Sequence, residues 1–382
     1  MTTHQPITIV GGGLGGLVLA RVLHRHGIEA VVHDLDSSPA ARGQGGMLDM
    51  HEESGQAALR AAGLFDRFRE IVHPGGEAMR IMGKDAVLRH EDDGRAGHRP
   101  EVNRSDLRRI LLDGLPEKAV RWGTKVAGAT ALGDGRHRVD LADGGTFTTD
   151  LLVGADGAWS KVRPLVSTAT PAYCGLSFVE FDLVDADRRH PDSAALVGGG
   201  MMFALAEEKG FLAHRETDGR LHVYAALRTP ADWAGPGGFG PADTAAVKAA
   251  LLERFAGWDD RLLALVRDAD GVPVARPIHA LPVGHRWDRT PGVTLLGDSA
   301  HLMSPFAGEG ANLAMIDGAD LAAAIVAHPG DVEGALAAYE ELLFPRAEAA
   351  AAESAANLDL LFRTDAPQGL LDLMAGHQRQ AI

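Results

Sequence analysis

The chain has 382 residues, 46% of them hydrophobic, which suffices for one large domain or two medium ones. A net charge of −15, from 37 basic and 52 acidic residues, argues against the basic face that nucleic-acid binding requires. The only cysteine, Cys174, cannot form an intramolecular disulfide, so we expect a reducing, cytoplasmic location. The N-terminus does not resemble a signal peptide, and no apolar run approaches the roughly 20 residues that span a bilayer, so no membrane partner is expected.

The N-terminal region predicts a strand, a helix and a second strand. Residues 7–10 form a short apolar strand, and residues 14–25 place apolar side chains at helical spacing. Residues 29–34 then form the second strand. Two strands joined by a helix within about 30 residues indicate a right-handed parallel crossover.

A glycine motif occupies the turn between the first strand and the helix. It reads Gly11-x-Gly13-x-x-Gly16 and contains Leu14 and Gly15. Such glycines permit a tight turn, close approach of the backbone to a pyrophosphate, and close packing of helix on strand. The amides at the helix N-terminus then bind the phosphates.

The sequence context of this motif decides its interpretation. The same spacing recurs at residues 235–240, but that copy follows no strand and is flanked by prolines, so we interpret it as a loop. After the N-terminal copy, Asp34 ends the second strand at about the distance expected for a partner of a ribose hydroxyl. The N-terminal motif therefore predicts dinucleotide binding, with a ligand-free glycine turn as the alternative.

The middle of the chain changes in character. Residues 54–70 are predicted to be helical, and Ser105 is predicted to cap another helix. Short strands follow from about 120 to 153, separated by turns at 133–135 and 143–145. Residues 172–285 indicate a largely β module, with a helix near 243–256. The tail from about 331 predicts a helix that Pro345 breaks or kinks.

A second strand-to-turn motif lies far downstream. Residues 293–296 form a strand that leads into Gly297-Asp298, where the carboxylate either binds ribose hydroxyls or caps a helix. Gly308 and Gly310 then allow the backbone to lie flat against a planar ring. The helix that follows begins at about Ala311, and its N-terminal amides suit a developing negative charge. A third motif, Asp156-Gly157, is either part of the same site or a simple turn.

In this order and at these intervals, the motifs resemble those of the FAD-dependent aromatic hydroxylases, single-component monooxygenases with a para-hydroxybenzoate-hydroxylase-like fold. The resemblance covers nearly the whole chain. Within the family, the chain is most similar to the tetracycline-inactivating (TetX-type) monooxygenases, through residues 45–51, 54–56, 101–108, 300–303 and 305–308.

The resemblance implies a set of FAD contacts. Asp34 binds the adenosine ribose, and Arg42 and Arg104 reach the phosphates and the ribityl region, although either arginine alone would suggest a surface ion pair. Asp49 lies near the flavin ring and Asp298 on the linker. The complete implied set is Gly11, Gly13, Leu14, Gly15, Gly16, Asp34, Arg42, Asp49, Arg104, Asp156, Asp298, Pro305, Gly308, Gly310, Ala311 and Asn312.

The implied substrate wall departs from the tetracycline enzymes. Where a glutamine and an arginine are expected, this chain has Glu180 and Met201, which add a negative charge and remove a positive one. His222 matches the family's substrate histidine, with a structural histidine as the alternative, and Phe203 and Phe306 complete the wall. Tetracycline itself is therefore left open.

The resemblance also implies the reaction. NADPH or NADH reduces the FAD, and O2 then forms a C4a-(hydro)peroxyflavin that hydroxylates, or inserts oxygen into, a polycyclic aromatic or polyketide-like molecule. Neither a catalytic nucleophile nor a metal is expected. Two alternatives are a non-catalytic FAD protein that sequesters its ligand and a flavin halogenase, whose Trp-x-Trp-x-Ile-Pro segment is not found in this chain.

The predicted fold class is α/β. Residues 1–70, 100–170 and 285–330 are expected to form a Rossmann-like FAD-binding domain, and residues 71–99 and 171–284 an interleaved β-rich substrate domain. Residues 331–382 are expected to form a bridging helix, and the protein is expected to be a monomer.

Overall fold

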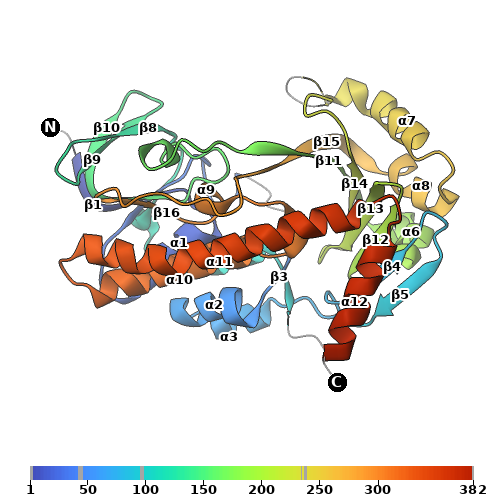
Figure 1. Ribbon diagram of the computed structural model, residues 1–382, viewed down its shortest axis with the longest axis horizontal. Helices are drawn as coiled ribbons and strands as arrows, with labels where there is room; N and C mark the ends of the chain where they lie inside the picture. The colour runs from blue at the N-terminus through green and yellow to red at the C-terminus, as the bar shows by residue number, and fades with distance from the viewer. Residues whose placement is uncertain (1–2, 42–45, 95–98, 234, 236–238, 381–382) are drawn as a thin grey trace. The chain divides into compact units, whose positions relative to one another are not determined.

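The computed structural model describes residues 3–41, 46–94, 99–233, 235 and 239–380 (Figure 1). The chain divides into two compact units, each assembled from three separate stretches. Unit 1 comprises residues 1–72, 104–172 and 280–354, and unit 2 comprises residues 73–103, 173–279 and 355–382. Both units combine helices with sheets, so the predicted α/β class is confirmed.

In the described part of the chain, unit 1 is built on a seven-stranded sheet. Its strands are β1 (Thr3–Val10), β2 (Val31–His33), β7 (Val120–Arg121), β8 (Val126–Ala131), β9 (His137–Leu141), β10 (Thr146–Gly154) and β16 (Val293–Leu295). The order is β7-β2-β1-β10-β9-β8, with β16 also paired to β10. The pairs β1–β2, β1–β10, β2–β7 and β10–β16 are parallel, and β8, β9 and β10 form the two predicted hairpins.

Two helices of unit 1, α1 and α10, lie side by side (Figure 1). The helices are α1 (Leu14–Arg25), α2 (Ala57–Ala62), α3 (Phe65–Glu70), α4 (Arg104–Asp113), α9 (Asp298–His301), α10 (Gly310–Ala327) and α11 (Val332–Leu361), of which the last belongs to unit 1 as far as residue 354. The short strand β3 (Met47–Asp49) accompanies them. A Cβ on Gly15 of α1 would lie 2.3 Å from the carbonyl oxygen of Ala314 in α10. One on Gly318 would lie 2.3 Å from the carbonyl oxygen of Gly15. Because no side chain fits there, α1 and α10 pack backbone against backbone.

Two helices differ from the prediction. Helix α11 continues through Pro345 without a break, because buried side chains on both sides of the proline, such as Leu343 and Ala347, hold both halves in place. Helix α4 begins at Arg104, so Ser105 lies in its first turn instead of capping it. Helix α10 is the one described helix that is long and apolar enough to cross a membrane, with a mean hydropathy of 1.3, a property it shares with core helices of soluble proteins.

Unit 2 also contains a seven-stranded sheet among its described residues. Its strands are β4 (Met79–Met82), β5 (Leu88–Asp92), β11 (Ala172–Leu183), β12 (Met201–Ala206), β13 (Lys209–Arg215), β14 (Leu221–Leu227) and β15 (Asp270–Ala280), in the order β15-β11-β14-β13-β12-β4-β5. The other elements are β6 (Glu101–Asn103), α5 (Ala186–Arg189), α6 (Pro191–Val197), α7 (Thr244–Arg254), α8 (Asp260–Arg267) and α12 (Gln368–Gln380). The loop predicted near 234–241 lies partly outside the described residues.

The two faces of this sheet differ in chemistry. Because side chains alternate along a strand, Phe181, Val223 and Ala213 point to one face. There they join side chains of α6, α7 and α8 in a continuous apolar core. The opposite face carries half-buried polar and apolar side chains, including Glu180 and His222.

The glycine contact between α1 and α10 predicts an unusual response to alanine. We expect Gly318→Ala to destabilise the protein by about 1–3 kcal/mol, because the new methyl group collides with the backbone of α1. Gly376→Ala, in α12 where a Cβ meets no atom within 4 Å, should be neutral or stabilising by up to about 1 kcal/mol. Urea unfolding of the two variants measures the difference, and equal stabilities would contradict the packing.

Candidate functional site

Three of the predicted cofactor segments leave the sheet of unit 1 at neighbouring strand ends. Strand β10 lies between β1 and β16, with Gly154 opposite both Val10 and Leu295. The turns after these strands therefore begin at one edge of the sheet, and Asp34 follows β2 on the other side of β1. Ligands of open α/β sheets bind at the carboxyl ends of the strands. The fold thus brings together residues from both ends of the chain.

The N-terminal glycine turn has the shape that a phosphate site needs. Gly11 adopts a φ of +110°, and a Cβ there would lie 2.1 Å from the carbonyl oxygen of Ala155. A Cβ on Gly16 would lie 2.2 Å from the carbonyl oxygen of Gly11. Gly13, the N-cap of α1, faces open space and makes no side-chain capping bond. The first amides of α1, which include those of Leu14 and Gly15, are therefore suited to an anion.

Asp34 is bound into this turn. Its Oδ2 accepts a hydrogen bond from the Gly12 amide at 2.6 Å, and its Oδ1 accepts one from the Asp36 amide at 2.7 Å. Its contact with a ribose stays a prediction. Arg108, which the sequence reasoning missed, is buried beneath the turn and donates to the carbonyl oxygens of Gly12 and Pro39.

The downstream turn is held by a buried ion-pair network. Gly297 has a φ of +58°, and its amide donates to Oδ2 of Asp317 at 2.9 Å. The same carboxylate contacts His301 at 2.6 Å and Arg346 at 3.0 Å. Burial opposes the charged forms of His301 and Asp317. The attraction between the two side chains outweighs burial, so the pKa of His301 is raised and that of Asp317 is lowered. This network fixes the backbone immediately before Asp298.

Ser299 and Arg163 connect the turn at Asp156 to the segment that contains Asp298. The Asp156 carboxylate accepts hydrogen bonds from Ser160 Oγ at 2.6 Å, Ser299 Oγ at 3.1 Å and the Lys161 amide at 2.6 Å. Buried Arg163 donates to the carbonyl oxygens of Ser299 and Asp298 at 2.8 and 3.1 Å. The side chain of Asp156 thus shapes the turn, and its contact with a cofactor stays a prediction.

A histidine between two carboxylates joins the segment around residue 50 to the start of α10. His51 lies 2.8 Å from Asp49 through Nε2 and 2.9 Å from Glu309 through Nδ1, and its side chain is 1% exposed. Ionised carboxylates only accept hydrogen bonds, so both ring nitrogens donate when the ring is an imidazolium. Burial opposes this charge, but the two partners outweigh burial and raise the pKa of His51 to about 9.

Asn312 completes this connection. Its buried side chain accepts from the His51 amide at 3.0 Å and donates to the carbonyl oxygens of Asp49 and Gly308 at 2.8 and 3.2 Å. No described side chain caps the N-terminus of α10, and a Cβ on Gly310 would face open space. These features suit an anionic ring edge at the first turn of α10.

The remaining predicted cofactor residues are placed as follows. Ala311 lies in the first turn of α10, and Pro305 begins a 3-10 turn, Pro305–Ala307. Arg104 begins α4, and its amide donates to the carbonyl oxygen of Gly46 at 3.1 Å. Arg42 lies outside the described residues.

Four predicted substrate residues share one face of the sheet in unit 2. Directly paired residues on neighbouring strands project to the same face. One row therefore contains Glu180 and Phe203, and the next contains His222 and Met201. Phe306 lies in the 3-10 turn of unit 1.

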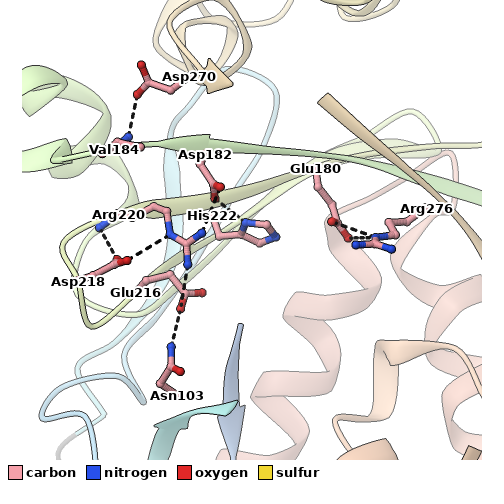
Figure 2. Close-up of polar contacts among 10 residues, drawn as sticks. All are labelled: Asn103, Glu180, Asp182, Val184, Glu216, Asp218, Arg220, His222, Asp270 and Arg276. Atoms are coloured by element: carbon pink, nitrogen blue, oxygen red, sulfur yellow. Dashed lines mark hydrogen bonds and ion pairs between the residues drawn. The ribbon is translucent and has the colours of Figure 1, made fainter. Parts of the chain in front are cut away.

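The negative charge of Glu180 is paired with an arginine from the neighbouring strand β15. Nε of Arg276, on β15, donates to both carboxylate oxygens at 3.1 Å (Figure 2). His222 contacts Asp182 through Nδ1 at 2.7 Å. The sequence reasoning missed both Arg276 and Asp182, because nothing in the local sequence connects Arg276 to a partner 96 residues away.

The His51 cluster predicts a distinctive pH dependence. Because the pKa of His51 is raised to about 9 from 6.5, its stabilising effect is complete below pH 6.5 and is lost as the pH rises to 9. Between pH 6.5 and pH 9, we expect the free energy of unfolding to fall by up to about 3 kcal/mol more in the wild-type protein than in His51→Gln. His137→Gln serves as a control, because burial lowers the pKa of His137. Urea unfolding at pH 6.5 and 9 measures the losses, and equal losses in wild type and His51→Gln would contradict the assignment.

Comparisons with known proteins agree with this geometry. The FAD binding domain family matches residues 4–354. Monooxygenase asqM of Emericella nidulans is 31% identical, over 97% of this chain and 98% of its own. HpxO of Klebsiella pneumoniae, solved with FAD and uric acid, has a TM-score of 0.78 at 23% identity, covering 98% of this chain and 93% of its own. Tetracycline destructase Tet(51) has a TM-score of 0.73 at 19% identity, covering 100% of this chain and 96% of its own. The chain therefore belongs to the FAD binding domain family and is an FAD-dependent monooxygenase with a para-hydroxybenzoate-hydroxylase-like fold.

Proposed function

We propose that this monooxygenase uses NADPH or NADH with O2 to hydroxylate, or insert oxygen into, a polycyclic aromatic or polyketide-like molecule. The observation that carries the proposal is the convergence of three turns at one sheet edge of unit 1. Beside them, the N-termini of α1 and α10 lack side-chain caps among the described residues. Such a site suits a long cofactor with anionic groups at both the pyrophosphate and the ring.

The residues of unit 1 have separable tasks in this proposal. Bound FAD supplies hydride acceptance and oxygen transfer, so no side chain need act as a nucleophile. The amides around Gly13 hold the pyrophosphate, and those around Gly310 stabilise negative charge at the ring. His51 keeps a proton between Asp49 and Glu309, which limits the negative charge of that cluster.

The substrate class follows from chemistry and relatives together. One face of the sheet in unit 2 combines apolar Met201 and Phe203 with polar Glu180 and His222, which suits a flat molecule with polar edges. The uric acid bound by HpxO and the tetracycline named for Tet(51) support this class. Tetracycline is one candidate, in either antibiotic resistance or biosynthetic tailoring. We further propose that the enzyme acts as a cytoplasmic monomer.

The phosphate role of the N-terminal turn is testable without turnover. Gly13→Val places a side chain in open space at the start of α1, so the protein should fold with a stability within about 0.5 kcal/mol of the wild-type apoprotein. It should bind FAD at least about 100-fold more weakly, because the valine occupies the phosphate position. Gly128→Val, in β8 and also facing open space, serves as the control. Equal FAD affinity, measured by flavin fluorescence quenching, would disprove this role.

The reaction itself is tested by isotope transfer. The FAD-loaded protein should oxidise NADPH or NADH and convert a polyphenol or tetracycline from a screening panel into a product heavier by one oxygen atom. With 18O2, mass spectrometry should find the label in the product. Substrate-stimulated nicotinamide oxidation that yields only H2O2 would argue against oxygen transfer. A yellow protein that binds panel members but never oxidises nicotinamide would instead indicate a sequestering function.

A further inference from the structure

A serine and a histidine of unit 1 form a hydrogen bond that neither the cofactor region nor the proposed substrate face uses. Ser167 follows the 3-10 turn Arg163–Leu165, and His285 lies in the segment between β15 and β16. The Ser167 hydroxyl oxygen and Nε2 of the His285 imidazole lie 2.8 Å apart. The two residues are 118 positions apart, so the fold and not the local sequence brings them together.

The direction of this hydrogen bond follows from the second partner of the imidazole. Nδ1 of His285 lies 2.6 Å from the carbonyl oxygen of Ala300, which can only accept. In the neutral ring, Nδ1 therefore carries the proton and Nε2 has the free lone pair. The Ser167 hydroxyl then donates to Nε2. A hydroxyl that donates to a base, which is itself oriented by a third group, is the arrangement that activates serine as a nucleophile.

The surroundings of His285 keep its ring neutral. Burial lowers the pKa of His285 below its usual value of 6.5. The hydrogen bond to Ala300 opposes this shift, and the positive charges of Arg163 and His301 reinforce it. No carboxylate of the described residues forms an ion pair with the ring, in contrast to His51, whose carboxylate partners raise its pKa. At neutral pH the His285 imidazole is therefore able to accept a proton as a general base.

A cavity at the surface of unit 1 gives a small molecule access to this pair. The cavity has a volume of about 540 Å³, and both Ser167 and Thr168 line it. The apolar side chains of Leu165, Val166 and Trp287 form further parts of its wall. A cavity of this size and chemistry suits a small molecule with an apolar chain.

Two backbone amides next to the hydroxyl favour negative charge on oxygen. The Ala169 amide donates to Oγ of Ser167 at 3.1 Å, and such a bond stabilises the alkoxide form of the hydroxyl. The Thr168 amide, directly after the serine, donates to no described residue. In hydrolases of the α/β class, the amide that follows the nucleophilic serine binds the oxyanion of the reacting carbonyl. The Thr168 amide is available for the same task.

We propose that Ser167 and His285 hydrolyse small carboxylic esters with an apolar acyl chain, an activity separate from oxygen transfer. The Ser167 oxygen forms a bond to the ester carbonyl carbon while its proton passes to Nε2 of His285. The bond from this carbon to the alcohol oxygen then breaks, and the alcohol leaves with that proton. Water, deprotonated by His285, attacks the acyl group on Ser167, releases the carboxylic acid and restores the hydroxyl. Ester and water are the only reactants.

The test uses the FAD-loaded protein without nicotinamide, with p-nitrophenyl butyrate as the substrate and a fluorophosphonate as a probe that labels activated serines. Wild-type protein should release p-nitrophenol, and peptide mass spectrometry should find the phosphonate on Ser167. Ser167→Ala should lower the protein-dependent rate of hydrolysis at least about 100-fold, and His285→Gln should slow hydrolysis and labelling by a similar factor. Because the pKa of His285 is lowered, the wild-type rate should fall with a midpoint below pH 6.5 as the ring becomes protonated.

Thr148→Val is the matched control for these variants. It removes another hydroxyl–imidazole pair, in which Oγ1 of Thr148 on β10 lies 3.0 Å from Nδ1 of His4 on β1. This variant should change neither hydrolysis nor labelling. The proposal is overturned if the probe does not label Ser167 of the wild-type protein, if Ser167→Ala hydrolyses the ester at the wild-type rate, or if His285→Gln is labelled as fast as wild type. The labelling of wild-type protein decides the question even where a variant fails to retain FAD.

Discussion

The close approach of α1 to α10 is the constraint on which the cofactor region depends. Gly15 and Gly318 let the two helix backbones touch where any side chain would separate them. Helix α1 begins at the turn after β1, and α10 follows β16 by way of α9 and the 3-10 turn Pro305–Ala307. Strands β1 and β16 are both paired to β10. The helix contact and the sheet together therefore fix the positions of two uncapped N-termini, one suited to phosphates and one to an anionic ring. Neither position is adjustable independently of the other.

Buried charges refine this arrangement at a cost. Asp317, His301 and Arg346 are taken from water in order to hold the Gly297 turn, and His51 is enclosed between two carboxylates. Replacing such groups with apolar ones often leaves a protein equally stable, so their benefit here is geometric. Each network connects segments that are distant in sequence and gives the backbone at the site a single conformation. The Glu180 and Asp182 pairs of unit 2 follow the same principle on an open sheet face.

The sequence predicts features that depend on local backbone chemistry. Glycine placement and hydrophobic periodicity predict the crossover from β1 through α1 to β2. They also predict the two hairpins after Val126 and the helix that starts at Gly310. Residues that act through distant partners escape such reasoning. Arg163 contacts Ser299, 136 residues away, and Arg276 contacts Glu180 across 96 residues. The roles of these two arginines depend on strand order, which no local pattern encodes. Helix α11 continues through Pro345 because tertiary packing overrides the local effect of the proline.

The pairing of β16 with β10 also dictates when the protein can mature during its synthesis. Strand β10 is complete at Gly154, but its partner does not leave the ribosome until residues 293–295 are made. Until then, residues 152–154 of β10 lack the partner that β16 later provides, and unpaired strand edges favour aggregation. Strands β11 to β15 of the unit 2 sheet are translated during this interval. Assembly of the cofactor site therefore cannot be complete before the segment from β16 to the start of α10 at Gly310 has been synthesised.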